Sequence, residues 1–278
     1  MNKNLQNKLN LIKKVNKNIE LKPQPKFDQT KSIQSKIIQK KLNIPKSIPN
    51  KKSLKIINLI LYSPGNKYYD EMKKIQTVYL EYLKLKIKDF SYYFYYYDPS
   101  IEKDYEITEN VIKIKGKETY IPGILNKTIK AFEIINKNFK YDYLVRTNIS
   151  SVINFKILLN FINRNNPDSC GKIWNLNIKN CKFKEYWGKY FYSGTCLIYK
   201  KNVITFIINN QNKLDKRLID DVSLGVLIYR QNFKNINFND VLFLKNSYKD
   251  GMITYRNKTK NRQLDINRIK FIINKLMI

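Results

Sequence analysis

Two adjacent acids carry the clearest chemistry in this sequence. Asp220 and Asp221 stand directly before the apolar run VSLGVLIYRQ, and this pattern predicts a helix at residues 220–231. A carboxylate held at a helix start can remain ionised and act as a general base. The same acids can instead be an N-cap and a partner of the helix dipole, each worth about 1 kcal/mol or less. The residues alone leave both interpretations open.

A tight polar turn, Tyr192-Ser193-Gly194-Thr195, precedes the acid pair along the chain. Its small residues allow backbone N–H groups to approach a ligand closely. The turn and the acids together are therefore the best candidate for a reacting centre.

A third polar cluster ends the apolar strand pattern of residues 141–147 and contains Arg146, Asn148 and Ser150. Ligands of open α/β proteins bind at the carboxyl ends of strands, so we expect a ligand at this cluster. Arginine is scarce in the chain, and Arg146 follows a buried strand, so we expect it to contact that ligand. Tyr62-Ser63 holds a similar position after the first predicted strand.

The elements that must position these clusters alternate between strand and helix from residue 54 onward. The patterns predict strands at 54–63, 90–100, 111–116, 141–147, 171–177, 241–246 and 252–258, a short strand before a helix within 190–209, and further helices at 69–85, 123–136, 153–163, 220–231 and 264–278. This alternation predicts an α/β fold with a Rossmann-like, mixed and mainly parallel sheet and helices on both faces. The glycines are too dispersed to form a phosphate-binding loop.

The first 52 residues differ from the rest of the chain. They are rich in lysine and proline, and Glu20 and Asp28 are their only acids. We predict a basic, partly disordered N-terminal arm at 1–52 and one large domain at 53–278.

The net charge of +31 does not by itself predict a nucleic-acid reader. Lysine far outnumbers arginine among the 53 basic residues and is spread evenly, whereas base-reading proteins concentrate arginines at contact positions. Abundant Lys, Asn, Ile and Tyr fit an AT-rich genome, such as that of a microbe or a large DNA virus. We expect only non-specific, salt-sensitive binding to nucleic acid.

Several other site types and locations are disfavoured by composition. The chain has no histidine, which argues against zinc sites and His-based acid–base chemistry. Cys170 and Cys181 are expected to be buried thiols, and Trp174 and Trp187 to pack in the core rather than line a pocket. No apolar run is long enough for a membrane span or a secretory signal, so we expect a cytoplasmic protein.

The clusters, in this order, resemble the GT-A-fold glycosyltransferases, and among them the Fringe-like and β-1,3-galactosyltransferase-like group. The resemblance covers roughly residues 54–270. YDYLVRTNISSVINF is similar to the stretch that carries the metal-binding DxD motif of that group, YFYSGTCLIY to its acceptor loop, IDDVSLGVLI to its acidic pair before a small helix, and ETYIPGILNKT to its D-x-Y-x-x-L-x-x-K-T segment.

The resemblance implies an inverting transfer of a sugar from a nucleotide-sugar, a UDP-sugar, to a hydroxyl of a glycan or protein acceptor. It implies Asp221 or Asp220 as the general base and Tyr192, Ser193, Gly194 and Thr195 as the acceptor loop. Tyr62 and Ser63 would hold the uracil and ribose, with Tyr62 stacking on the base.

The departures from the group's pattern are as informative as the matches. Asn148 and Ser150 stand where the group has two acids, and Asn and Ser oxygens are poor substitutes for carboxylates in binding Mn²⁺ or Mg²⁺. We therefore expect that no metal ion is held in the usual way. The cations expected to neutralise the donor diphosphate instead are Lys127, Arg146, Arg256 and Lys258.

Two other functions remain open. One is a GT-A-like protein that binds a nucleotide-sugar or glycan without turnover, which the missing DxD motif motivates. The other is a basic nucleic-acid-associated protein.

Overall fold

The structure is a computed structural model, and it describes residues 53–277 except for 180, 239–240 and 244–247. The described helices and strands belong to one compact unit, Leu54–Ile278. The basic arm predicted at residues 1–52 lies outside the described residues.

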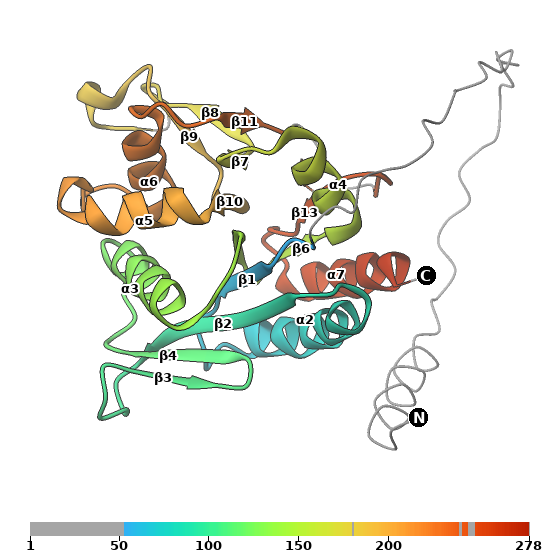
Figure 1. Ribbon diagram of the computed structural model, residues 1–278. Helices are drawn as coiled ribbons and strands as arrows, with labels where there is room; N and C mark the ends of the chain where they lie inside the picture. The colour runs from blue at the N-terminus through green and yellow to red at the C-terminus, as the bar shows by residue number, and fades with distance from the viewer. Residues whose placement is uncertain (1–52, 180, 239–240, 244–247, 278) are drawn as a thin grey trace, which may run out of the picture. The chain divides into compact units, whose positions relative to one another are not determined.

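A sheet of eight strands forms the middle layer of this unit (Figure 1). In spatial order its strands are β11 (Asn235–Asn237), β7 (Ser169–Gly171), β10 (Cys196–Lys200), β5 (Tyr143–Asn148), β1 (Ile56–Leu61), β2 (Phe90–Asp98), β4 (Val111–Lys115) and β3 (Tyr105–Thr108). The run β5-β1-β2-β4 is parallel, whereas β10 is antiparallel to both of its neighbours and β3 is antiparallel to β4. The predicted mixed, mainly parallel sheet is confirmed.

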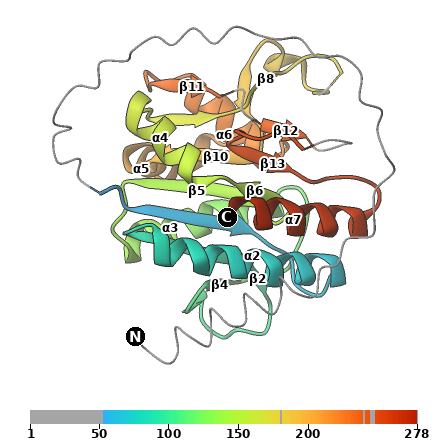
Figure 2. The same cartoon turned by 90° about the vertical axis from the view of Figure 1, so that its right-hand side faces the viewer.

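Helices cover both faces of this sheet (Figures 1 and 2). One face packs against α2 (Lys67–Lys86), α4 (Phe155–Asn165) and α7 (Arg262–Leu276), and the other against α3 (Gly123–Asn138), α5 (Lys201–Asn209) and α6 (Asp220–Tyr229). Three of these helices begin at an asparagine whose side chain accepts backbone N–H bonds of the first turn, at Asn66, Asn154 and Asn261. Among the described helices, none is long and apolar enough to cross a membrane.

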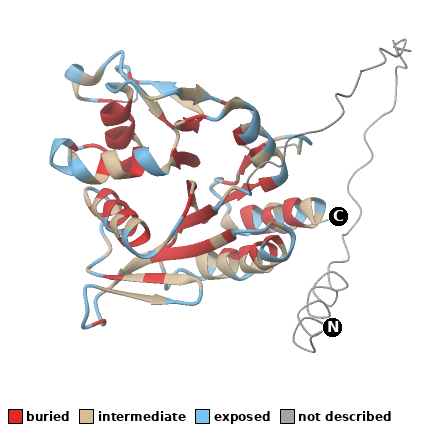
Figure 3. Cartoon of the chain, viewed as in Figure 1, coloured by how far each residue is buried: buried red, intermediate tan, exposed pale blue. Residues whose placement is uncertain are grey.

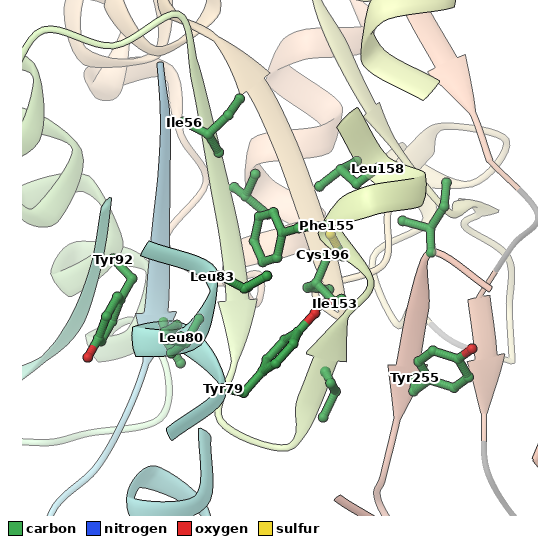
Figure 4. Packing of buried hydrophobic residues seen from close by; sticks show 14 of the residues in the cluster. Ile56, Tyr79, Leu80, Leu83, Tyr92, Ile153, Phe155, Leu158, Cys196 and Tyr255 are labelled. Carbon is green, nitrogen blue, oxygen red and sulfur yellow. Dashed lines mark hydrogen bonds between the residues drawn. The ribbon is translucent and has the colours of Figure 1, made fainter. Parts of the chain in front are cut away.

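Strand side chains alternate between two apolar cores, one on each face of the sheet. Buried residues are concentrated in the central strands and in the helices that pack against them (Figure 3). On one face, aromatic and aliphatic residues of α2 and α4, including Tyr79, Leu83 and Phe155, pack together (Figure 4). In β5, Tyr143 and Val145 face this core, so the alternation sends Arg146 to the side of α3 and α6. Strand periodicity thus delivers a buried cation to one particular face.

Two smaller sheets complete the unit and were only partly predicted. β6 (Ser151–Ile153) pairs with β13 (Thr254–Arg256), which also pairs with β12 (Val241–Phe243), and β8 (Ile173–Asn175) pairs with β9 (Tyr190–Tyr192). The predicted strand at 171–177 is in fact divided between β7 and β8, which belong to different sheets. The strands β3, β6 and β11 were missed because they are short and carry polar residues.

Candidate functional site

A cleft of about 630 Å³ collects the polar clusters at the carboxyl ends of β1 and β5. Parallel neighbours end at the same edge of a sheet, which is why residues far apart in sequence meet there. Its lining includes, of the residues predicted from sequence, Tyr62, Ser63, Lys127, Arg146, Asn148, Ser150, Ser193, Gly194, Thr195, Asp220, Asp221, Arg256 and Lys258. Tyr192 does not line it; its side chain is fully buried, and its hydroxyl lies 2.9 Å from the Ser169 hydroxyl.

Arg146 lies in the first wall of the cleft, and the Asp220 carboxylate already neutralises its charge. The side chain is 1% exposed; Nη2 donates to the Asp220 carboxylate, Nη1 to the Gly194 carbonyl at 3.0 Å, and Nε to the Tyr95 hydroxyl at 3.2 Å. Burial, the largest single influence, lowers the pKa of this guanidinium, but Asp220, Tyr95 and Asp221 together outweigh burial and the pKa is raised overall. The expectation that Arg146 faces a diphosphate as a free cation is therefore not supported.

Within the described part of the chain, Asp221 is a cleft carboxylate without a cationic partner in direct contact. Its Oδ2 accepts the N–H of Gly194 at 2.7 Å, and its Oδ1 accepts the N–H of Val222 at 2.9 Å. Burial, and then the charge of Asp220, raise the pKa of Asp221 to about 7, against the opposing effect of the Gly194 N–H. Such a pKa suits a general base that works near neutral pH.

The structure contradicts the interpretation of Asp220 as the N-cap, whereas the position of Asp221 in the first turn agrees with a partner of the helix dipole. The N-cap of α6 is Ile219, which makes no side-chain capping bond, and both acids lie in the first helical turn. Asp220 instead forms the buried ion pair with Arg146, which leaves Asp221 facing the cleft.

Gly194 is hydrogen-bonded both to residues at the end of β5 and to Asp221 of α6. Its carbonyl accepts bonds from Arg146 and from Nδ2 of Asn148, the latter at 2.8 Å. A Cβ at this position would lie 2.9 Å from Oδ2 of Asp221 and 3.3 Å from Nη1 of Arg146. Only glycine therefore fits without displacing the acid.

A second wall of the cleft carries cations of a different kind. Nη1 of Arg256 donates to the hydroxyls of Ser150, at 2.6 Å, and Ser151, at 3.3 Å. No carboxylate in the described part of the chain forms an ion pair with Arg256 or with the exposed Lys258. Burial, and then the charges of Arg146 and Arg262, lower the pKa of Arg256 to about 10. This wall is therefore short of negative charge.

Asn148 and Ser150, the residues expected at the position of a DxD motif, do not fit a divalent metal ion. The Asn148 amide donates to a carbonyl, and the Ser150 hydroxyl accepts from a guanidinium, so a cation already occupies the hydroxyl that a metal would use. Within residues 53–277, apart from those left undescribed, no group of three or more Asp, Glu, His or Cys could hold a metal ion.

The expected stacking role of Tyr62 is wrong. Its ring is 5% exposed, contacts Phe94 and Tyr96 edge-on at 6.1 and 5.6 Å between centroids, and its hydroxyl donates to Asp70. Tyr120, 68% exposed, lines the cleft and presents an open aromatic surface instead. Tyr120 was missed as a site residue although it lies within the quoted segment ETYIPGILNKT.

Lys127 is also paired and is not a free cation. Its Nζ lies 2.6 Å from Oε2 of Glu118 and donates to the Tyr62 carbonyl at 3.4 Å. Burial lowers the pKa of Lys127, and Glu118 opposes this shift. Glu118, which begins the quoted segment ETYIPGILNKT but was given no role of its own, thus neutralises the side chain predicted to bind a phosphate.

Two predictions outside the cleft have opposite outcomes. Trp174 and Trp187 are 45% and 36% exposed, so the core-packing prediction for them is wrong, and neither lines the cleft. Cys170 and Cys181 are buried free thiols, as predicted.

No protein-family model matches the sequence, and no curated protein matches it significantly. Among solved structures, the chain is similar to a glycosyltransferase involved in the glycosylation of the major capsid of PBCV-1, with 12% identity and a TM-score of 0.47 over 78% of this chain and 98% of that one. It is also similar to the inositol-1-phosphate CTP transferase from T. maritima, with 10% identity and a TM-score of 0.46 over 81% of this chain and 97% of that one.

Proposed function

We propose that this chain is a GT-A-type glycosyltransferase that uses a nucleotide-sugar, a UDP-sugar, and neutralises the donor diphosphate with side chains instead of a metal ion. One observation carries this proposal. A single cleft holds a carboxylate with a pKa near 7, Asp221, together with cations that lack carboxylate partners, Arg256 and Lys258. A base and an anion site side by side are what direct displacement of a diphosphate requires.

The proposed reaction is one inverting displacement. Asp221 takes the proton of the acceptor hydroxyl, whose oxygen forms a bond to the anomeric carbon from the side opposite the diphosphate. The bond between that carbon and the diphosphate oxygen breaks, and the electron pair leaves with the diphosphate. Arg256 and Lys258 stabilise the charge that develops there.

The remaining lining residues divide between donor and acceptor in this proposal. Ser63 and Tyr120 would contact the nucleoside. They line the cleft just after the end of β1 and just before the start of α3. Ser193 and Thr195, whose hydroxyls lie 2.7 Å apart, flank the Gly194–Asp221 bond and would contact a glycan or protein acceptor.

A thermal-shift and calorimetry screen of nucleotide-sugars, run with Mn²⁺ and with EDTA, tests this function. A bound donor raises the melting temperature in proportion to the logarithm of its concentration over Kd. We expect a UDP-sugar to stabilise the protein equally under both conditions, and transfer to persist in EDTA. Strict dependence of binding and transfer on Mn²⁺ would refute the metal-independent mechanism.

The misfit of the metal site supports a second candidate, a protein that binds a nucleotide-sugar or glycan without turnover. Calorimetric binding with neither hydrolysis nor transfer across the donor panel would favour it. Tight nucleic-acid binding with a steep salt dependence, and no response to UDP-sugars, would instead identify a nucleic-acid-associated protein.

A further inference from the structure

A continuous set of hydrogen bonds joins the end of β5 to Asp221 through one glycine. Asn148 and Arg146 both donate to the Gly194 carbonyl, at 2.8 and 3.0 Å, and the Gly194 N–H donates to Asp221 at 2.7 Å. Asn148 and Arg146 therefore hold one side of Gly194, and Asp221 is bonded to the other.

We propose that Asn148, together with Arg146, is a positioning residue that orients Asp221 by anchoring Gly194. The strand-end position that carries the metal-binding motif in the resembled group would thus serve here to orient the base. This inference rests on the proposed function for its catalytic meaning, although the positioning itself does not depend on turnover.

Glycine explains why two anchors are needed. Its backbone is the most permissive of any residue, so Gly194 would sample many conformations unless its carbonyl were held. A larger residue cannot supply the rigidity, because a Cβ would lie 2.9 Å from the Asp221 carboxylate. Two donors on the carbonyl fix the rotation about the Cα–C bond while the N–H points at the acid.

Substitution of Asn148 tests the positioning of Asp221 without changing the charges around it. The ionisable groups that act on Asp221 are Asp220 on its own helix, Arg146 of β5, Arg256 of β13 and Tyr199 of β10. Asn148 is neutral, so its removal leaves every one of these charges in place. A change in the pKa of Asp221 when Asn148 is truncated therefore reports the loss of the bond that anchors Gly194.

Carboxyl-carbon NMR titration of the full chain tests the inference. The Asp221 signal is assigned by its loss in Asp221→Asn, and the pKa is then measured in wild type and in Asn148→Ala. Because the Gly194 N–H stabilises the ionised acid, loosening it should raise the pKa of Asp221 by about one unit, the effect of losing one hydrogen bond to a charged group. Asn165→Ala is the matched control, since it removes an asparagine amide bond of 2.9 Å to a backbone carbonyl far from the cleft, and we expect no shift.

An unchanged Asp221 pKa in a folded Asn148→Ala protein would overturn the inference. Should that variant fail to fold, Asn148→Ser provides the same test, because its hydroxyl is too short to reach the carbonyl. Once a donor is known, Asn148→Ala should lower kcat about tenfold and leave the donor KM unchanged, since the Arg256 wall is intact. Because the titration needs no turnover, failure of the proposed transferase activity would leave its result standing.

Discussion

The two arginine-bearing walls of the cleft look alike in sequence and differ in electrostatics. Arg146 and Arg256 both reach polar groups near the end of β5, and both lie within the same cleft. Arg146 forms an ion pair with the Asp220 carboxylate, whereas the hydrogen bonds of Arg256 to described residues go to the hydroxyls of Ser150 and Ser151. In the first wall, Asp220 neutralises Arg146, and the pair acts as scaffold. In the second wall, no carboxylate of the described residues pairs with Arg256, so a substrate can supply the anion. Each prediction below alters one wall and leaves the other intact.

The largest effect is expected on the rate of sugar transfer when Asp221, the acid beside Arg146 and Asp220, is replaced. Asp221→Asn should lower the rate of sugar transfer by about 10² to 10⁴-fold, since it removes the proton acceptor. Initial rates with a donor found in the nucleotide-sugar screen measure this. Donor affinity should be nearly unchanged, because Arg256 and Lys258 are untouched. A variant with the full wild-type rate would remove Asp221 from the mechanism.

The neighbouring acid should affect folding more than chemistry. Asp220→Asn leaves Arg146 buried without a counter-charge, and we expect a loss of about 3–5 kcal/mol in the free energy of unfolding. Urea denaturation provides the measurement. Asp215→Asn is the matched control: Asp215 pairs with the 56% exposed Arg217, so its loss should be far smaller. Equal losses in both variants would contradict the assignment of Arg146 and Asp220 as scaffold.

The second wall should govern affinity for the diphosphate. Arg256→Ala should weaken UDP binding by about 10- to 100-fold, the equivalent of one hydrogen bond to a charged group, with little change in stability. Calorimetry with UDP measures it. Arg164→Ala, at an exposed position on α4, is the control and should bind as wild type does. Unchanged UDP affinity in Arg256→Ala would show that the anion site lies elsewhere.

The last effect concerns pH. The folded pKa of Asp221 is raised to about 7, above the unfolded value of about 3.9, so the folded state holds this proton more tightly. The stabilising contribution is present at low pH and is lost as the pH rises from about 4 to about 7. Wild type should therefore lose more stability than Asp221→Asn between pH 5 and 7.5, as urea midpoints would show. Parallel changes in the two proteins would indicate an ordinary pKa for Asp221.

Much of the fold follows from local patterns. The apolar run at 54–63 and the helical spacing at 69–85 predicted β1 and α2 closely, because burial on both faces and amphipathic periodicity leave local traces. β6 was not predicted, since Ser151–Ile153 becomes a strand only by pairing with β13, about a hundred residues away. Short strands of this kind depend on their partners.

The site was predicted in membership more than in roles. Most of the polar residues named from the sequence at strand ends and helix starts line one cleft, because parallel strands end at one edge. The roles of Tyr62, Lys127 and Arg146 were not predicted, since each is buried against a partner that no local pattern reveals. Tyr120 illustrates the converse, an open aromatic ring whose exposure only packing decides.

The alternating elements, the layered α/β architecture and the polar residues at the strand ends follow from the sequence alone, because they depend on periodicity and chain order. Which charges are neutralised, in contrast, depends on contacts between segments far apart in the sequence. Arg146 and Asp220 are 74 residues apart, and Arg256 and Ser150 are 106 apart. A direct ion pair forms only where two charged side chains come into contact, so contacts between distant segments make one arginine part of the scaffold and leave the other available to an anion.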